Sequence, residues 1–221
     1  MRRRRAPALS TPDADRSTSR LEIVATALLA LATVATAWSG YQASRWNGEQ
    51  AKAFNRASAA RIESTRASSR ADSLTQIDVA TFTQWVDAYA RDEKLLADFY
   101  FERFRAEFKP AVDAWIATKP LKTPNAPLTP FAMPQYRLEA NAEAKRLDND
   151  AEAWSARARV YLQRATNYVL AVVLFAATLF FAGMSTKLRS PPLRVVLLAF
   201  GVTLFLGTAL WVATSPISVS I

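Results

Sequence analysis

The chain contains no cysteine and no histidine, and these two absences exclude several kinds of site. Without cysteine there is no disulfide, no thiol nucleophile and no zinc site of the Cys/His type. Without histidine there is no Ser-His-Asp triad. Glycine is scarce, at five residues in 221, which leaves no glycine-rich phosphate-binding loop. The sequence therefore predicts a protein that is not an enzyme, with no catalytic, cofactor-binding or metal-binding residues.

The net charge of +9 is distributed unevenly. Residues 1–20, MRRRRAPALSTPDADRSTSR, carry six arginines and two aspartates, and residues 186–194, TKLRSPPLR, carry three basic residues and no acidic one. Both segments lie next to apolar stretches. This placement fits membrane topology better than nucleic-acid binding, so we expect the lipid bilayer as a partner and no nucleic acid.

Three apolar stretches are long enough to cross a bilayer, which takes roughly 20 residues of helix. We predict transmembrane helices at residues 21–41, 166–184 and 195–213. Pro191-Pro192 forces a turn in the short loop between the last two. The two basic segments lie on the same side of a three-span chain, and the positive-inside rule makes that side the cytoplasm.

The first apolar stretch has two interpretations. Ala35-Thr36-Ala37 resembles the cleavage site of a secretory leader. The stretch is long for a leader, however, and Trp38 and Tyr41 stand where the aromatic belt of a membrane helix would lie. An uncleaved anchor is therefore the favoured interpretation, and partial cleavage stays open.

Small residues recur at alternating steps of four and three in two segments, one that follows the first span and one that precedes the second span. This spacing is typical of two helices in close, coiled-coil-like contact. We predict an antiparallel helical hairpin that extends from the membrane, with this helix-packing seam: Ala53, Ala57, Ala60, Ala67, Ala71, Ala144, Leu147, Ala151, Trp154 and Ala158.

The large aromatic residues outside the spans are concentrated between the two seam segments. Ile77, Phe82, Trp85 and Tyr89 fall on one helical face, and helix breaks are expected near Arg91-Asp92 and at Lys109-Pro110. We predict a distal helical cap that offers an interaction surface built from these residues: Trp85, Tyr89, Phe99, Tyr100, Phe101, Phe104 and Phe108.

The predicted fold is all-α, an integral membrane protein with a helical extracytoplasmic segment. In order, the chain comprises a basic disordered cytoplasmic tail (1–20), the first span (21–41), a first stalk helix (42–76), the cap (77–118), a proline-rich loop (119–136), a second stalk helix (137–165), the second span (166–184), a cytoplasmic loop (185–194), the third span (195–213) and an extracytoplasmic tail (214–221).

The chain resembles an uncharacterised family of bacterial inner-membrane proteins. The resemblance implies one N-terminal span, a helical extracytoplasmic segment and a C-terminal two-span hairpin, but no activity and no functional residue. It extends over residues 21–194 and is carried by ATAWSGYQASRWNGEQ (35–50), FTQWVDAYA (82–90), ADFYFERFR (97–105), LTPFAMPQYR (128–137) and NYVLAVVLFAATLFFAGMSTKLR (167–189).

Two functions are compatible with these features. The favoured one is a scaffold or accessory subunit in the bacterial plasma membrane, with its N-terminus cytoplasmic and residues 42–165 outside. It would act through a homo-oligomer or an unidentified membrane or extracytoplasmic partner. The alternative is a membrane sensor whose helical outer domain binds a ligand and whose signalling partner is a separate protein.

Overall fold

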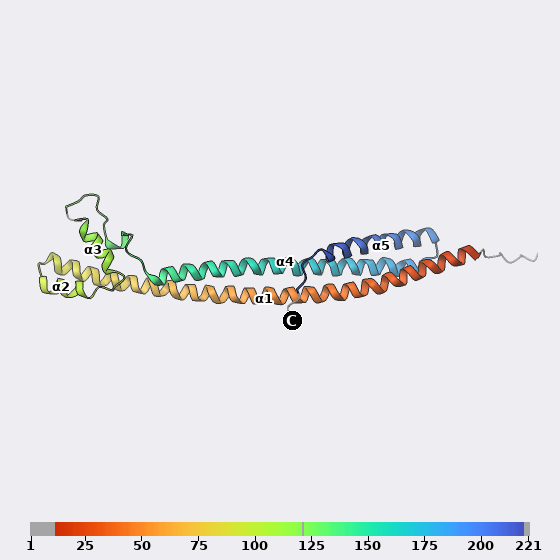
Figure 1. Cartoon of the computed structure of the whole chain (residues 1–221), viewed down its shortest axis with the longest axis horizontal. Helices are drawn as coiled ribbons and strands as arrows, with labels where there is room; N and C mark the ends of the chain where they lie inside the picture. The colour runs from red at the N-terminus through yellow and green to blue at the C-terminus, as the bar shows by residue number, and fades with distance from the viewer. Residues whose placement is uncertain (1–11, 121, 219–221) are drawn as a thin grey trace, which may run out of the picture. The chain divides into compact units, whose positions relative to one another are not determined.

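A computed structural model describes residues 12–120 and 122–218 of the chain (Figure 1). This part of the chain is 83% helix and contains no strand, which confirms the predicted all-α class. Its elements are α1 (Pro12–Ala90), α2 (Lys94–Glu102), α3 (Lys109–Ala117), the short 3-10 helix η1 (Pro130–Ala132), α4 (Glu139–Lys187) and α5 (Pro191–Ala213).

Three of the described helices are long and apolar enough to cross a membrane. The most apolar windows of α1, α4 and α5 have mean hydropathies of 1.8, 2.2 and 2.3. They correspond to the three spans predicted from the sequence. As the spacing of small residues predicts, α1 and α4 each continue without a break between an apolar stretch and a polar one.

The described chain divides into two compact units. Unit one comprises Met1–Ala53 and Arg157–Ile221, and unit two comprises Phe54–Ala156. Helices α1 and α4 each contribute one part to each unit.

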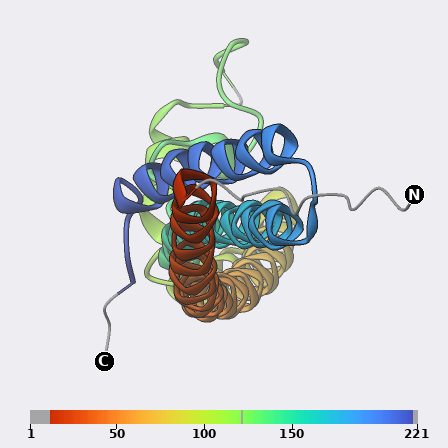
Figure 2. The ribbon, with the colours of Figure 1, turned by 90° about the vertical axis from the view of Figure 1, so that its right-hand side faces the viewer.

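In unit one, the apolar part of α1 packs against α4 and α5. Ala25 and Leu28 of α1 form one buried cluster with Ala182 of α4 and Leu198 of α5. Figure 2 looks onto the ends of these three helices. Small side chains at the contact allow the helix backbones to approach closely, which is the usual arrangement where helices pack in an apolar surrounding.

The charged groups of unit one include an ion pair beside this cluster. A guanidinium nitrogen of Arg194, in the first turn of α5, lies 3.3 Å from a carboxylate oxygen of Glu22 in α1. The pair places the basic start of α5 next to the start of the apolar stretch of α1.

Residues after α5 fold back onto α1 and α4. The carbonyl oxygen of Pro216 accepts hydrogen bonds from Trp46 Nε1 (3.3 Å) and from the Tyr168 hydroxyl (3.2 Å). The backbone N–H of Ser218 donates to Gln42 Oε1 over 2.9 Å, and Gln42 is fully buried. Pro216 and Ser218 of the predicted tail at 214–221 are therefore bound to these helices, and residues 219–221 lie outside the described part.

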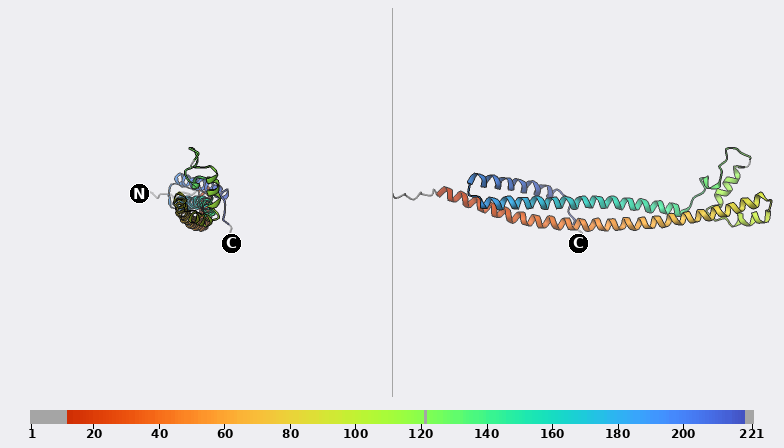
Figure 3. Two further views of the ribbon diagram at one scale, coloured as in Figure 1. Left: turned by 90° about the vertical axis from the view of Figure 1, so that its left-hand side faces the viewer. Right: turned by 180° about the vertical axis from the view of Figure 1, so that it is seen from behind.

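In unit two, α1 and α4 run antiparallel and in contact, as the view from behind also shows (Figure 3). Ser64 Oγ donates to the carbonyl oxygen of Ala144 over 2.9 Å. Eight residues before Ser64, the guanidinium of Arg56 lies 4.6 Å from the ring centre of Trp154. Ala71 clusters with Leu138 and Ala140.

Most of the predicted seam residues are buried. Ala60, Leu147 and Trp154 are half-buried. The remaining seven have less than a tenth of their surface exposed: Ala53, Ala57, Ala67, Ala71, Ala144, Ala151 and Ala158. Ala53 and Ala158 belong to unit one, and the others belong to unit two.

The predicted end of the disordered tail is wrong. Residues 12–20 were expected to be disordered but belong to α1; residues 1–11 lie outside the described part. Proline is well tolerated in the first turn of a helix, and Pro12 begins α1. Helix α1 continues through the predicted first stalk helix and the first part of the cap to Ala90, next to the break expected near Arg91-Asp92. The proline-rich loop contains η1.

The interior of the seam can be tested by overpacking. Ala151 is fully buried, whereas Ala153 in the same helix is exposed. We expect Ala151→Leu to lower the free energy of unfolding by about 1–3 kcal/mol, because the added methylenes force neighbouring side chains from their rotamers. The control Ala153→Leu should be nearly neutral. Thermal unfolding in lipid nanodiscs measures both; equal losses would show that this face of α4 is not tightly packed.

Candidate functional site

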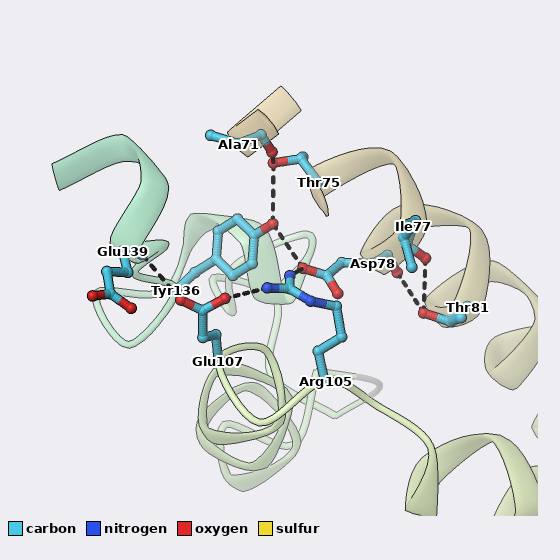
Figure 4. Close-up of polar contacts among 9 residues, drawn as sticks. All are labelled: Ala71, Thr75, Ile77, Asp78, Thr81, Arg105, Glu107, Tyr136 and Glu139. Carbon is cyan, nitrogen blue, oxygen red and sulfur yellow. Dashed lines mark hydrogen bonds and ion pairs between the residues drawn. The ribbon is translucent and has the colours of Figure 1, made fainter. Parts of the chain in front are cut away.

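Two features of unit two combine polar or aromatic side chains from segments that are far apart in the sequence. The first is a polar network around Arg105, drawn in Figure 4, whose members are Thr75, Asp78, Arg105, Glu107 and Tyr136. We call it the Arg105 network. The second is a cavity between α1 and α3, which we call the aromatic cavity.

Asp78 is a carboxylate in the middle of a buried helix face. It has no exposed surface, and Phe82, one turn later, belongs to the aromatic core of unit two. Arg105 Nη1 donates to Asp78 Oδ2 over 2.8 Å. Within the described structure, the other oxygen, Oδ1, is buried and receives no hydrogen bond. A buried carboxylate needs a partner of this kind, since an unpaired charge in an apolar interior is strongly unfavourable.

The hydroxyl groups of Thr75 and Tyr136, beside Asp78, have fewer protons to donate than hydrogen-bond acceptors within reach. Thr75 donates its hydroxyl proton to the carbonyl oxygen of Ala71 (2.9 Å). The Tyr136 hydroxyl lies 3.2 Å from Thr75 Oγ1 and 3.1 Å from Asp78 Oδ2, but it has only one proton for these two acceptors. The Tyr136 hydroxyl therefore donates to only one of these two oxygens at a time.

Burial and two neighbouring charges shift the pKa of Asp78 in opposite directions. Burial raises the pKa of Asp78 above its ordinary value of 3.8, and the neighbouring charge of Glu107 raises it further. The charge of Arg105 and the hydrogen bonds from Tyr136 and Arg105 oppose the shift without cancelling it. Burial also raises the pKa of Tyr136, so its hydroxyl keeps its proton.

Arg105 also connects α1 to the beginning of α4. Its Nη2 forms a close ion pair with Glu107 Oε2, and Glu107 Oε1 accepts a hydrogen bond from the backbone N–H of Glu139 over 3.0 Å. Glu139 is the first residue of α4, so Glu107 supplies an acceptor for a free N–H group at the positive end of the helix dipole. The network therefore joins α1, the segment between α2 and α3, and α4.

The aromatic cavity has a volume of about 380 Å³. Its walls consist mainly of apolar and aromatic side chains from the end of α1 and from α3, and its charged residues are two lysines. The lining residues are Trp85, Val86, Tyr89, Trp115, Ile116, Lys119, Pro120 and Lys122.

Hydrogen bonds position the α3 side of this cavity. Trp115 Nε1 donates to the carbonyl oxygen of Pro127 over 2.7 Å, which fixes the indole ring. After α3, Lys119 adopts a left-handed conformation with φ of 53°, and its backbone N–H donates to the carbonyl oxygen of Ile116. A residue with a Cβ atom is disfavoured there by roughly 1–2 kcal/mol, so the surrounding contacts must impose this turn.

The seven residues predicted for the interaction surface have different environments. Tyr89 and Phe99 are exposed. Tyr100 and Phe101 are partly buried and pack against the aromatic core, and Trp85 is buried in it while also lining the cavity. Phe104 and Phe108 are core residues, with 5% and 0% exposure, and their assignment to a surface is wrong.

The predicted helical faces of the cap also need correction. Ile77 is half exposed, whereas Asp78 is buried with Phe82 and Trp85. The expected break near Arg91-Asp92 is present: α1 ends at Ala90, and Asp92 has a φ of 61°. The second break is earlier than expected, because α2 ends at Glu102 and α3 begins at Lys109 with Pro110 in its first turn.

The Arg105 network was not predicted from the sequence, and neither were the cavity residues that belong to α3 and to the turn after it. One signal for the network was available, since Asp78 interrupts the run of Leu74, Phe82 and Trp85 on one helical face. Nothing local identified Trp115 or Lys119 as neighbours of Trp85. Phe131 of η1 also packs against the aromatic core.

No protein-family model matches the sequence, and neither a curated protein nor a solved structure matches it. The structure thus defines a class, an all-helical protein with three described helices long and apolar enough to cross a membrane. Its function has to be argued from the side chains of this chain.

The charge state of Asp78 predicts a pH dependence of stability. Because the folded carboxyl binds its proton more tightly than the unfolded one, the free energy of unfolding falls as pH rises from 3.8 through the raised pKa. Asp78→Asn removes this titration. Thermal unfolding of both proteins across this pH range should show the wild type losing stability relative to the variant. The opposite slope would show that Arg105 outweighs burial and lowers the pKa.

Proposed function

We propose that the protein is a bacterial plasma-membrane protein of three spans whose extracytoplasmic helical module docks a partner, as a scaffold or accessory subunit. The three apolar helices support insertion. The side of the membrane follows from charge, because Arg20, Lys187, Arg189 and Arg194 flank the apolar stretches at the ends that the positive-inside rule assigns to the cytoplasm.

Aromatic side chains support the opposite, outer boundary. Trp38 and Tyr41 of α1 are exposed, as the residues of an aromatic belt are. Trp46 and Tyr168 hold the carbonyl of Pro216. In this proposal residues 42–165 project from the outer surface, and their small-residue seam forms a coiled-coil-like stalk.

Because the chain has no native cysteine, its orientation can be tested with single introduced cysteines. Ser73 and Thr186 are both exposed, and the proposal assigns Ser73 to the outside and Thr186 to the cytoplasm. A membrane-impermeant maleimide should label Ser73→Cys in intact cells, whereas Thr186→Cys should react only after the membrane is permeabilised. The reverse pattern, or labelling of both in intact cells, would contradict the proposed topology.

The observation that carries the docking role is the apolar surface around α2. Leu95 has an exposed fraction of 90%, and Phe99, one turn later in α2, and Tyr89, near the end of α1, are also exposed. Large apolar side chains gathered on an exposed surface are typical of protein-binding sites, and tyrosine and phenylalanine are enriched there. The expected occupant is a second copy of the chain or a separate membrane or extracytoplasmic protein.

Photo-crosslinking tests this role directly. A benzophenone amino acid at Leu95 or Phe99 should form a discrete adduct in intact membranes, and mass spectrometry of the adduct would distinguish a second copy from another protein. Ile62 is the matched control, because it lies in α1 with 54% exposure but far from α2 in the sequence. Adducts of equal yield at Ile62, or none at Leu95 and Phe99, would argue against docking through this surface.

The aromatic cavity favours a second candidate function. A membrane sensor needs a ligand site in its outer domain, and a cavity of about 380 Å³ is within the range of small-molecule sites. Such a sensor would transmit its signal through a separate protein in the membrane. Thermal stabilisation of the full-length protein by a small ligand is the observation that would support it.

A further inference from the structure

We propose that the aromatic cavity binds a small aromatic carboxylate, with the ring between the indole groups and the carboxylate beside the lysines. The inference deepens the second candidate function, the ligand-binding role, and does not depend on docking of a protein partner. It rests on three properties of the cavity: its shape, the flat aromatic faces of its walls and the sign of its charge.

The aromatic side chains that line the cavity pack against neighbouring rings without a ligand. Trp85 stacks on Tyr89, with ring centres 5.5 Å apart, and on Phe82, at 5.8 Å. On the opposite wall, Trp115 is held by its hydrogen bond to Pro127 and contacts Phe82 edge to face at 5.4 Å. Preformed flat walls favour a planar aromatic body, which gains offset-stacked and edge-to-face contacts at little cost in side-chain entropy.

The positive charge of the residues that line the cavity favours a negatively charged ligand. Lys119 and Lys122 are the two charged residues that line the cavity in the described structure, and neither wall contributes a carboxylate. Trp85 and Tyr89 also line a different hollow beside α2, whose charged residues are Lys94 and three acidic residues: Asp92, Glu93 and Asp98. A carboxylate at the lysine side would form charge-assisted hydrogen bonds with ammonium groups.

A quaternary ammonium ligand is the main alternative, since three aromatic rings can bind such a cation. The two lysines oppose it, because each places a positive charge at the same cavity. The two ligand classes therefore predict opposite effects when the lysines are removed, and this difference makes the assignment testable.

Indole-3-acetate is a suitable probe for the full-length protein in lipid nanodiscs, with empty nanodiscs as the control for partitioning into lipid. Saturation-transfer NMR should show saturable binding through the ring protons. The neutral isostere indole-3-acetamide should bind roughly tenfold more weakly, which corresponds to the loss of one charge-assisted hydrogen bond. Equal affinity of the two compounds, or no saturable binding of indole-3-acetate, would overturn the proposal.

Three variants locate the site. Lys119→Gly combined with Lys122→Ala should weaken indole-3-acetate binding by at least about tenfold, and glycine suits the left-handed backbone at position 119. Ile116→Trp should abolish binding by filling the cavity while circular dichroism stays unchanged. Lys145→Ala, an exposed lysine of α4 outside the cavity, is the matched control and should bind as the wild type does.

The outcomes separate this inference from the proposed functions. Undiminished binding in Ile116→Trp would place the ligand elsewhere and overturn the assigned site. Saturable binding of choline that strengthens when the lysines are removed would overturn the anionic class and leave a ligand-binding role in place. Failure of both probes with intact crosslinking at Leu95 would remove the inference and leave the docking role standing.

Discussion

The arrangement of unit two depends on the pairing of one buried carboxylate with one arginine. Asp78 points from α1 into an apolar interior, where its charge is tolerable only because Arg105 approaches to 2.8 Å. Arg105 in turn holds Glu107, and Glu107 accepts from the first N–H of α4. Through these contacts, α1, the segment before α3 and the start of α4 constrain one another. Breaking a buried pair of this kind on one side costs about 3–5 kcal/mol, a large fraction of the stability of a typical domain.

The network also determines where the aromatic side chains lie. Arg105 is placed between Phe104 and Glu107, so its bond to Asp78 brings the segment after α2 against α1. Phe104 and Phe108 then enter the core with Phe82. The following helix, α3, brings Trp115 to the other side of the same core, and the aromatic cavity opens between Trp115 and Trp85. A ligand in the cavity would therefore contact walls whose separation the Arg105 network helps to set.

Features that depend on local periodicity could be predicted from the sequence. The long apolar stretches and the alternating steps of small residues identified α1, α4 and α5, and seven of the ten predicted seam residues are buried. The seam residues could be predicted because the burial of each one follows from its position on one face of a helix. Membrane insertion and the coiled-coil-like character of the stalk remain proposals built on that pattern.

Features that depend on contacts between distant segments could not be predicted. Tyr100 and Phe104 are spaced one helical turn apart in the sequence, but α2 ends at Glu102. Propensity gives no reason for this end; the long-range attraction of Arg105 to Asp78, 27 positions away, provides one. For the same reason, the sequence grouped Ile77 with Phe82 and Trp85, whereas in the structure Ile77 is half exposed and Asp78 is buried. Hydrophobicity alone places a lone aspartate on the wrong face when its partner is distant.

A double-mutant cycle on Asp78 and Arg105 tests the central claim most directly. The free energy of unfolding would be measured for Asp78→Leu, for Arg105→Met and for the double variant in nanodiscs. Both single changes remove the same contact, and Arg105→Met also leaves the buried Asp78 without its charged partner. The double variant should therefore lose less stability than the sum of the two, by about 1–3 kcal/mol. Losses that add within about 0.5 kcal/mol would show that the two residues do not interact, and would contradict the account of how unit two is held together.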